Sequence, residues 1–273
     1  MHRRPYLPLL AASLIALPGL AAAETPTANT IVDRAILAAE LESTIAEHDM
    51  IQVAIRQEET TSDGTASVRD VTAVVHGAQL ENARLELGEG TIRVLNNSTG
   101  WAMMRGQLDT RVQTPRMAAG TIRQTLFPLL LPFSLRMGGV RLGAVTEGSF
   151  DGTPVWEINI DFTPEFFSAP SMFTTWKVFI SRKDNLVLGA EFLPHVEYIA
   201  VIDEGIRYRY LKRQDTDGRS LAAQVLLDGI DVNGVENGHV RVTKMSSTTA
   251  GPLDLSLFIH PDEKERLDAG DVF

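Results

Sequence analysis

The sequence contains no cysteine, which excludes structural disulfides, thiolate metal sites and a lipid-modified cysteine after an export signal. None of its six histidines has a partner at metal-ligand spacing such as H-x-x-x-H. Its 25 basic residues are outnumbered by 35 acidic ones, and this balance argues against binding to nucleic acid or to anionic lipid surfaces by charge. We therefore expect no metal, no cofactor and no nucleic-acid partner.

No catalytic motif stands out in the sequence. Ser149, within the run 148–152, occupies the wrong position between its glycines for a nucleophile elbow. The acidic turns at 215–218 and 231–234 would need an oxygen ligand where Arg213 and Gly229 stand, so they do not form EF-hand loops. We expect a non-catalytic protein, while an exported hydrolase whose carboxylates meet only in three dimensions stays a third hypothesis.

The N-terminus has the features of an export signal. Arg3 and Arg4 precede the apolar stretch Leu7–Leu20, and the small residues Ala21–Ala23 stand before Glu24. The apolar stretch is interrupted by two prolines and is shorter than the roughly 18 residues that span a bilayer, which disfavours a membrane anchor. We predict that residues 1–23 are a signal peptide, cleaved near Ala23-Glu24, and that the mature protein is periplasmic. The arginine pair partly resembles a twin-arginine signal, so the export route stays open.

Most of the mature chain alternates apolar and polar residues with a period of two, which is typical of β-strands. In the run Trp156–Phe162, for example, every second residue is apolar. Glycine and asparagine at short intervals favour antiparallel hairpins over βαβ units, and Asp217-Gly218 marks one such hairpin. Strands are predicted, among others, from Met50 onward and at 67–75, 80–87, 92–96, 100–104, 196–201, 206–211, 221–227, 240–244 and 253–259.

Two segments break the alternation. A helix is predicted over 30–46, with Thr30 and Asp33 placed as in a capping box, and a second helix begins at Thr114. The second helix leads into the run 126–135, which has no charged residue and whose two prolines exclude a regular strand or an unbroken helix. Such a segment has to be covered by protein, by a partner or by an apolar ligand.

These elements predict an α+β fold with one domain over residues 24–260 and an acidic tail at 261–273 that frays. The domain is expected to be a curved antiparallel sheet, an incomplete β-barrel of about 10–11 strands. A sheet with one apolar face needs a cover, and we expect the N-terminal helix and the inserted segment 114–135 to supply it.

Three stretches of the sequence, at 114–135, 155–161 and 176–183, resemble the lipoprotein-carrier (LolA/LolB-like) superfamily and its exported relatives. The resemblance extends over about residues 30–260. It implies a curved, incompletely closed sheet covered by helices, with an apolar cavity that receives acyl chains. Arg116, Arg123 and Arg136 are candidates for the arginine that controls the lid in the carriers. Whether lipoproteins or another lipid or outer-membrane component is the ligand stays open.

Together these observations predict a lipid or acyl-chain binding protein whose partner is a lipid or an acylated protein. The predicted cavity lies under the cover and is lined by Trp101, Ile122, Leu126, Phe127, Leu129, Leu130, Leu131, Phe133, Trp156, Ile158 and Trp176. If the cover is packed permanently, the same residues form an ordinary core.

The main alternative is a non-catalytic envelope scaffold that docks a protein partner through the same apolar segment. Phe273 at the C-terminus is a residue with which outer-membrane barrels commonly end, but Asp271 stands where those proteins carry an apolar residue. We therefore do not expect an integral membrane protein.

Overall fold

The computed structural model describes residues 25–40, 49–76, 81–97, 99–164, 166–167, 174–194, 204–231 and 233–268. Its strands are β1 (Asp49–Thr60), β2 (Ala66–His76), β3 (Asn82–Glu86), β4 (Ile92–Asn96), β5 (Thr99–Met104), β6 (Gln107–Leu108), β7 (Val140–Phe150), β8 (Thr153–Phe162), β9 (Thr174–Ser181), β10 (Val187–Pro194), β11 (Gly205–Thr216), β12 (Arg219–Ile230) and β13 (Glu236–Pro252). Its helices are α1 (Ala28–Ala39), α2 (Thr114–Leu126) and α3 (Pro261–Asp268), with short 3-10 turns η1 (Pro128–Leu130), η2 (Phe133–Arg136) and η5 (Leu255–Leu257).

The strands form one open, 13-stranded sheet in the order β6-β5-β4-β3-β2-β1-β13-β12-β11-β10-β9-β8-β7. The chain thus enters the sheet in the middle at β1, runs outward to one edge at β6, crosses to the other edge at β7, and returns to the middle at β13. Every pairing is antiparallel, and β1 pairs with β13 and with β2 over nearly its whole length. The predicted curved antiparallel sheet is confirmed, with more strands than the expected number.

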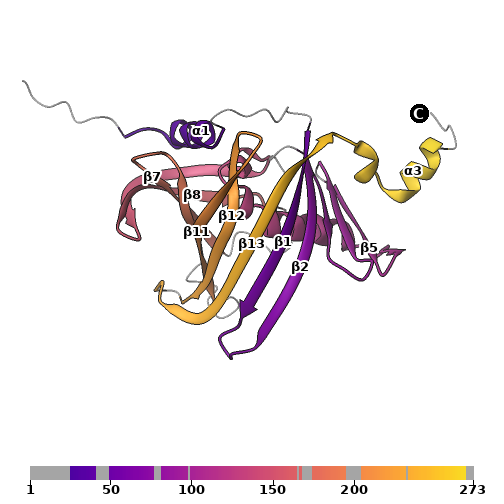
Figure 1. Cartoon of the computed structure of the whole chain (residues 1–273), viewed down its shortest axis with the longest axis horizontal. Helices are drawn as coiled ribbons and strands as arrows, with labels where there is room; N and C mark the ends of the chain where they lie inside the picture. Colours follow the sequence, from indigo (N-terminus) through magenta and orange to yellow (C-terminus); the bar gives the residue numbers. More distant parts are fainter. Residues whose placement is uncertain are drawn as a thin grey trace, which may run out of the picture.

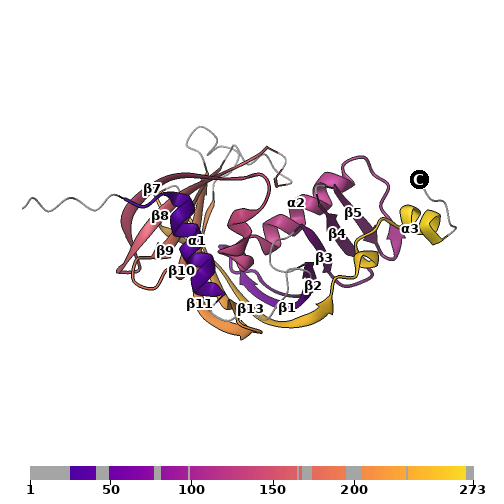
Figure 2. The ribbon, with the colours of Figure 1, turned by 90° about the horizontal axis from the view of Figure 1, so that it is seen from above.

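The crossing from β6 to β7 passes over one face of the sheet and contains α2, η1 and η2. Seen from above, the sheet bends around this segment, which lies inside the curve (Figure 2). The long strands β13, β1 and β2 form the middle of the sheet (Figure 1). Residues that point into the curve are buried along the first half of β1, where Ile51, Val53 and Ile55 alternate with exposed neighbours.

The helices cover the two halves of the sheet separately (Figure 2). α1 packs against β7 and β12 through Ile31, Val32 and Ala35, whereas α2 packs against β4 and β5. The predicted start of the first helix was wrong by two residues, because the hydroxyl of Thr27 accepts a hydrogen bond from the Thr30 amide (3.2 Å) and caps the helix. The predicted extension beyond position 40 lies outside the described residues.

Two further predictions for the C-terminal region were wrong. The apolar alternation at 253–259 suggested a strand, but Asp254 accepts a hydrogen bond from the Ser256 amide (3.0 Å) and starts the turn η5 instead. The acidic tail was expected to fray, yet Pro261–Asp268 form α3, with Asp262 and Glu263 in the first turn, where acidic residues favour a helix. The predicted strand at 196–201 lies outside the described residues.

The segment after β13 covers the outer face of β4 and β5. Phe258 is buried there with Met50, Val94 and Trp101 in a small cluster, separate from the main core. The indole Nε1 of Trp101 donates a hydrogen bond to the Phe258 carbonyl oxygen (2.9 Å). In the described part of the chain, no helix is long and apolar enough to cross a membrane.

Candidate functional site

Close packing of α2 on β5 fixes the position of the inserted segment. Gly100 makes this approach possible, because a Cβ atom built on it would lie 2.5 Å from the Pro115 carbonyl oxygen and 2.8 Å from the Ala119 nitrogen. The helix runs from Thr114 to Leu126, with Pro115 in its first turn and Pro128 just beyond its end, close to the predicted bounds. Gln113, and not Thr114 as its residue type suggests, takes the N-cap position, without a side-chain cap hydrogen bond among the described residues. The chain is thereby delivered into the middle of the curved sheet.

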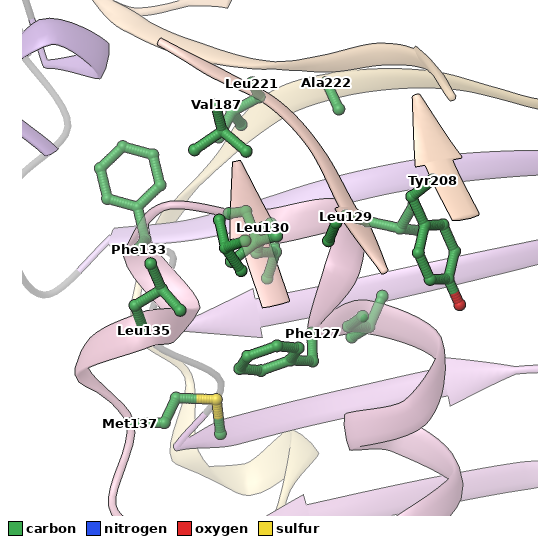
Figure 3. Packing of buried hydrophobic residues seen from close by; sticks show 14 of the residues in the cluster. Phe127, Leu129, Leu130, Phe133, Leu135, Met137, Val187, Tyr208, Leu221 and Ala222 are labelled. Carbon is green, nitrogen blue, oxygen red and sulfur yellow. The ribbon is translucent and has the colours of Figure 1, made fainter. Parts of the chain in front are cut away.

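All ten residues from Leu126 to Leu135 are buried. The polar groups of the segment have partners: the Ser134 hydroxyl donates to the Phe127 carbonyl oxygen (2.7 Å), and the Tyr210 hydroxyl donates to the Pro128 carbonyl oxygen. Figure 3 shows side chains of the segment within the cluster, with Leu129 on the side of Tyr208. Protein therefore covers this apolar run.

Phe127 lies at the centre of an aromatic cluster and is fully buried. Its ring makes edge-on contacts with Phe162, Phe166, Phe167 and Trp176 at centroid distances of 5.3, 5.7, 6.4 and 5.7 Å. Edge-to-face pairs of this kind add to the stabilisation from burial. The segment is thus anchored in the core at this residue.

A cavity of ≈540 Å³ lies between the inner face of the sheet and the side of α2 and η1. Its volume falls within the roughly 300–1,000 Å³ of ligand pockets. Its lining is Gln57, Glu59, Ser67, Arg69, Thr121, Gln124, Thr125, Pro128, Leu129, Phe167, Trp176, Phe192, Glu204, Ile206, Tyr208, Val225, Leu227, Arg241 and Thr243. The cavity therefore lies beside the inserted segment and not beneath its most buried part.

One wall of the cavity is aromatic. The ring of Trp176 stacks with those of Phe192, Tyr208 and Phe167 at centroid distances of 5.2, 6.2 and 5.9 Å, and Leu129 completes this wall from the inserted segment. Burial raises the pKa of Tyr208 to about 12, so its phenol is neutral at physiological pH. This part of the cavity is suited to apolar groups.

The opposite part of the cavity is polar because the inner face of the β1–β2 hairpin changes character along its length. Val71, Ala73 and Val75 point inward along β2 and are buried, whereas Arg69 and Ser67, nearer the turn, are exposed. β1 shows the same change, from apolar residues up to Ile55 to Gln57 and Glu59. The cavity is thus amphipathic, with an apolar wall and a polar rim.

A hydrogen-bonded cluster occupies one side of that rim. His239 Nε2 lies 2.8 Å from Glu59 Oε1, and His239 Nδ1 lies 3.0 Å from Glu204 Oε1. Arg241 Nε also donates to Glu59 Oε1 (3.0 Å). Desolvation opposes charge on His239 and on Glu59, but their hydrogen bonds outweigh it. The bonds to Glu59 and Glu204 raise the pKa of His239, and the bonds to His239 and Arg241 lower that of Glu59.

Gly229 leaves room for this cluster. A Cβ atom at Gly229 would lie 2.3 Å from Glu204 Oε1 and 2.7 Å from the His239 Cβ. The residues of the cluster are far apart in the sequence and were not predicted to bind, since they come from β1, β13 and the residue before β11. Their only sequence signal is the change from apolar to polar on the inner face of the hairpin.

The structure places the predicted site residues in four environments. Leu129 and Trp176 line the cavity. Trp101 lies in the separate cluster under Phe258, and Trp156 lies beneath the Arg182 guanidinium (4.7 Å to the ring centroid). The remaining predicted residues are packed in the main core and are absent from the cavity lining: Ile122, Leu126, Phe127, Leu130, Leu131, Phe133 and Ile158.

Two of the three candidate lid arginines contact protein, whereas Arg116 is exposed on α2. Arg136 bridges to α1, where its Nη1 donates to Asn29 Oδ1 (2.7 Å) and its Nη2 pairs with Asp33. Arg123 Nη1 donates to the Phe166 carbonyl oxygen (3.2 Å), and its guanidinium stacks on the Phe166 ring. Both contacts hold the inserted segment in its present position.

A second, larger hollow of ≈690 Å³ lies on the outer face of β13, β1, β2 and β3. Several of its lining residues point away from the inner face, because they alternate along their strands with the inward-pointing residues: Ala54, Arg56, Asp70 and Lys244. It is shallower and lacks an aromatic wall. The cavity at Trp176 is therefore the better candidate for an amphipathic ligand.

No protein-family profile and no curated protein matches the sequence. Comparison of structures finds a LolA superfamily protein from Nitrosomonas europaea, with a TM-score of 0.56 and 16% identity over 86% of this chain and 99% of that one. A DUF1329 family protein from Desulfovibrio piger has a TM-score of 0.54 with 10% identity, covering 86% and 98% of the two chains. A Vibrio parahaemolyticus protein domain named for outer membrane lipoprotein sorting has a TM-score of 0.53 with 10% identity, covering 83% and 97%. The predicted LolA-like fold is confirmed.

Proposed function

From the LolA-like fold and the amphipathic cavity, we propose that this protein binds a lipid or an acylated protein, with an acyl chain against the aromatic wall. The observation that carries the proposal is the stacked wall of Trp176, Phe192 and Tyr208 facing a cavity of ≈540 Å³. Each methylene removed from water contributes about 0.8 kcal/mol. An acyl chain gains more from such a wall than a small polar ligand does.

We further propose that the protein acts in the periplasm, after removal of residues 1–23, in envelope lipid or lipoprotein handling. Two proteins that share its fold are named as a LolA superfamily protein and for lipoprotein sorting, which is in keeping with this role. The alternative, docking of a protein partner through 126–135, would require residues that are all buried to leave the core. The cavity therefore supports lipid binding better than it supports the scaffold.

The three tryptophans of the chain give a direct test, since each lies in a different environment. A Trp101→Phe/Trp156→Phe variant keeps only Trp176, and a Trp156→Phe/Trp176→Phe variant keeps only Trp101, which lies outside the cavity. A fatty acid brominated along its chain quenches tryptophan fluorescence on near contact. We expect saturable quenching of the Trp176 protein and none of the Trp101 protein.

Circular dichroism of both variants checks that they are folded. Equal quenching of the two proteins would indicate non-specific association, and no quenching of either would refute acyl-chain binding in this cavity.

A further inference from the structure

The polar rim of the cavity carries charges of both signs, and its carboxylates are already engaged. Glu59 contacts His239 and Arg241, and Glu204 contacts His239 and accepts a hydrogen bond from Asn237 Nδ2 (2.7 Å). Arg241 is committed to Glu59 in the same cluster. The charged groups of this cluster are therefore engaged with one another.

Arg69 is different. It points inward from β2 opposite Gln57 of β1 and lines the cavity. Among the residues that the structure describes, its guanidinium forms no ion pair and no hydrogen bond. The chain has a formal net charge of −10, yet this arginine on the cavity rim has no acidic partner in the described part of the chain. Its guanidinium is therefore available to bind an anion.

A second arginine lies near the same side of the cavity. Arg93 Nη1 donates to the Met117 carbonyl oxygen (3.4 Å) and to the hydroxyl of Thr121, a cavity-lining residue. Desolvation lowers the pKa of Arg93, and the positive charge of Arg69 lowers it further. Asp109, the carboxylate that acts in the other direction, is itself paired with Arg111 (2.6 Å). The side of the cavity next to α2 thus has an excess of positive charge.

We infer that the ligand is an amphiphile with an anionic headgroup, a carboxylate or a phosphate, bound by Arg69 on the rim while its acyl chain lies against the Trp176 wall. This inference rests on the proposed function and names the class of headgroup. The two ends of the cavity match the two ends of such a molecule. Arg93 adds to the positive potential without direct contact, since its Nη1 is held by α2.

The test compares a brominated fatty acid with its methyl ester, which has the same chain and no charge. Binding is measured by quenching of the protein that keeps only Trp176, with and without Arg69→Gln. Because a charge-assisted hydrogen bond contributes about 1.5–3 kcal/mol, we expect Arg69→Gln to weaken binding of the acid about tenfold or more. Binding of the ester should not change.

Arg56→Gln is the matched control, since Arg56 lies on the outer face of β1 and pairs with Asp70. It should leave both affinities unchanged. A lipid with the same chain and a phosphate headgroup should lose affinity with Arg69→Gln as the acid does.

Two outcomes would overturn the inference while leaving acyl-chain binding intact. One is equal affinity of the starting protein for acid and ester. The other is a loss with Arg69→Gln that is the same for acid and ester, which would show that the substitution disturbs the cavity as a whole. If neither acid nor ester quenches Trp176, the proposed function itself fails.

Discussion

Truncation of Phe127 tests whether the inserted segment is part of the core or a cover that opens readily. Phe127 is fully buried and touches four other aromatic rings. Substituting a buried phenylalanine by alanine costs about 3–5 kcal/mol, and the lost edge-to-face contacts place this site in the upper part of that range. We expect Phe127→Ala to lower the free energy of unfolding by about 4–5 kcal/mol, a large share of the roughly 5–15 kcal/mol of a typical domain.

The measurement is urea denaturation followed by circular dichroism. Val112→Ala is the control, because Val112 is 97% exposed just before α2 and its loss should change the stability by less than about 0.5 kcal/mol. If Phe127→Ala does not fold, Phe127→Leu gives a milder test, with an expected loss of about 1–2 kcal/mol. A loss below about 1.5 kcal/mol for Phe127→Ala would contradict permanent packing and would favour a cover that opens.

Two further substitutions test the packing of α2 and the rim cluster. Gly100→Ala should destabilise the protein by about 1–3 kcal/mol in thermal or urea unfolding, because the new methyl group meets the backbone of Pro115. Gly138→Ala, which has nothing within 4 Å, should have little effect, and equal losses would refute this account of the α2–β5 contact. The raised pKa of His239 means that its stabilising contribution is complete below about pH 6.5 and is lost as the pH rises through the folded-state pKa. The stability difference between the parent protein and His239→Gln should therefore shrink between pH 6 and pH 9 in urea titrations, and a difference that is constant or grows would argue against a charged His239 bound to Glu59.

Local features of the structure could be predicted from the sequence because they depend on neighbours along the chain. Alternation gave the strands, Pro115 and Pro128 marked the two ends of α2, and Asp217-Gly218 formed the predicted hairpin between β11 and β12. Alternation did not produce a strand at 253–259, although four alternating apolar residues resemble one. A hydrogen bond that the Asp254 carboxylate accepts from the Ser256 amide favours a turn there.

The candidate site could be predicted only in part, because it depends on contacts between distant segments. Periodicity indicates which face of a strand a side chain lies on, but it does not give the order of the strands in the sheet or the residues that pack against that face. Trp101 and Trp176 both look like wall residues in the sequence, yet they lie on opposite faces of the sheet. The rim cluster joins Glu59 to His239, 180 positions apart.

The sequence by itself determined an α+β protein with a long antiparallel sheet and an apolar, proline-broken segment that has to be covered. Tertiary structure decided how that segment is covered. The chain enters the sheet in its middle, so the connection between the two edges must cross one face, and the apolar run 126–135 is that crossing. The residues of this segment fill the core. The cavity lies beside the segment, where the sheet extends beyond it and the inner face of the sheet becomes polar.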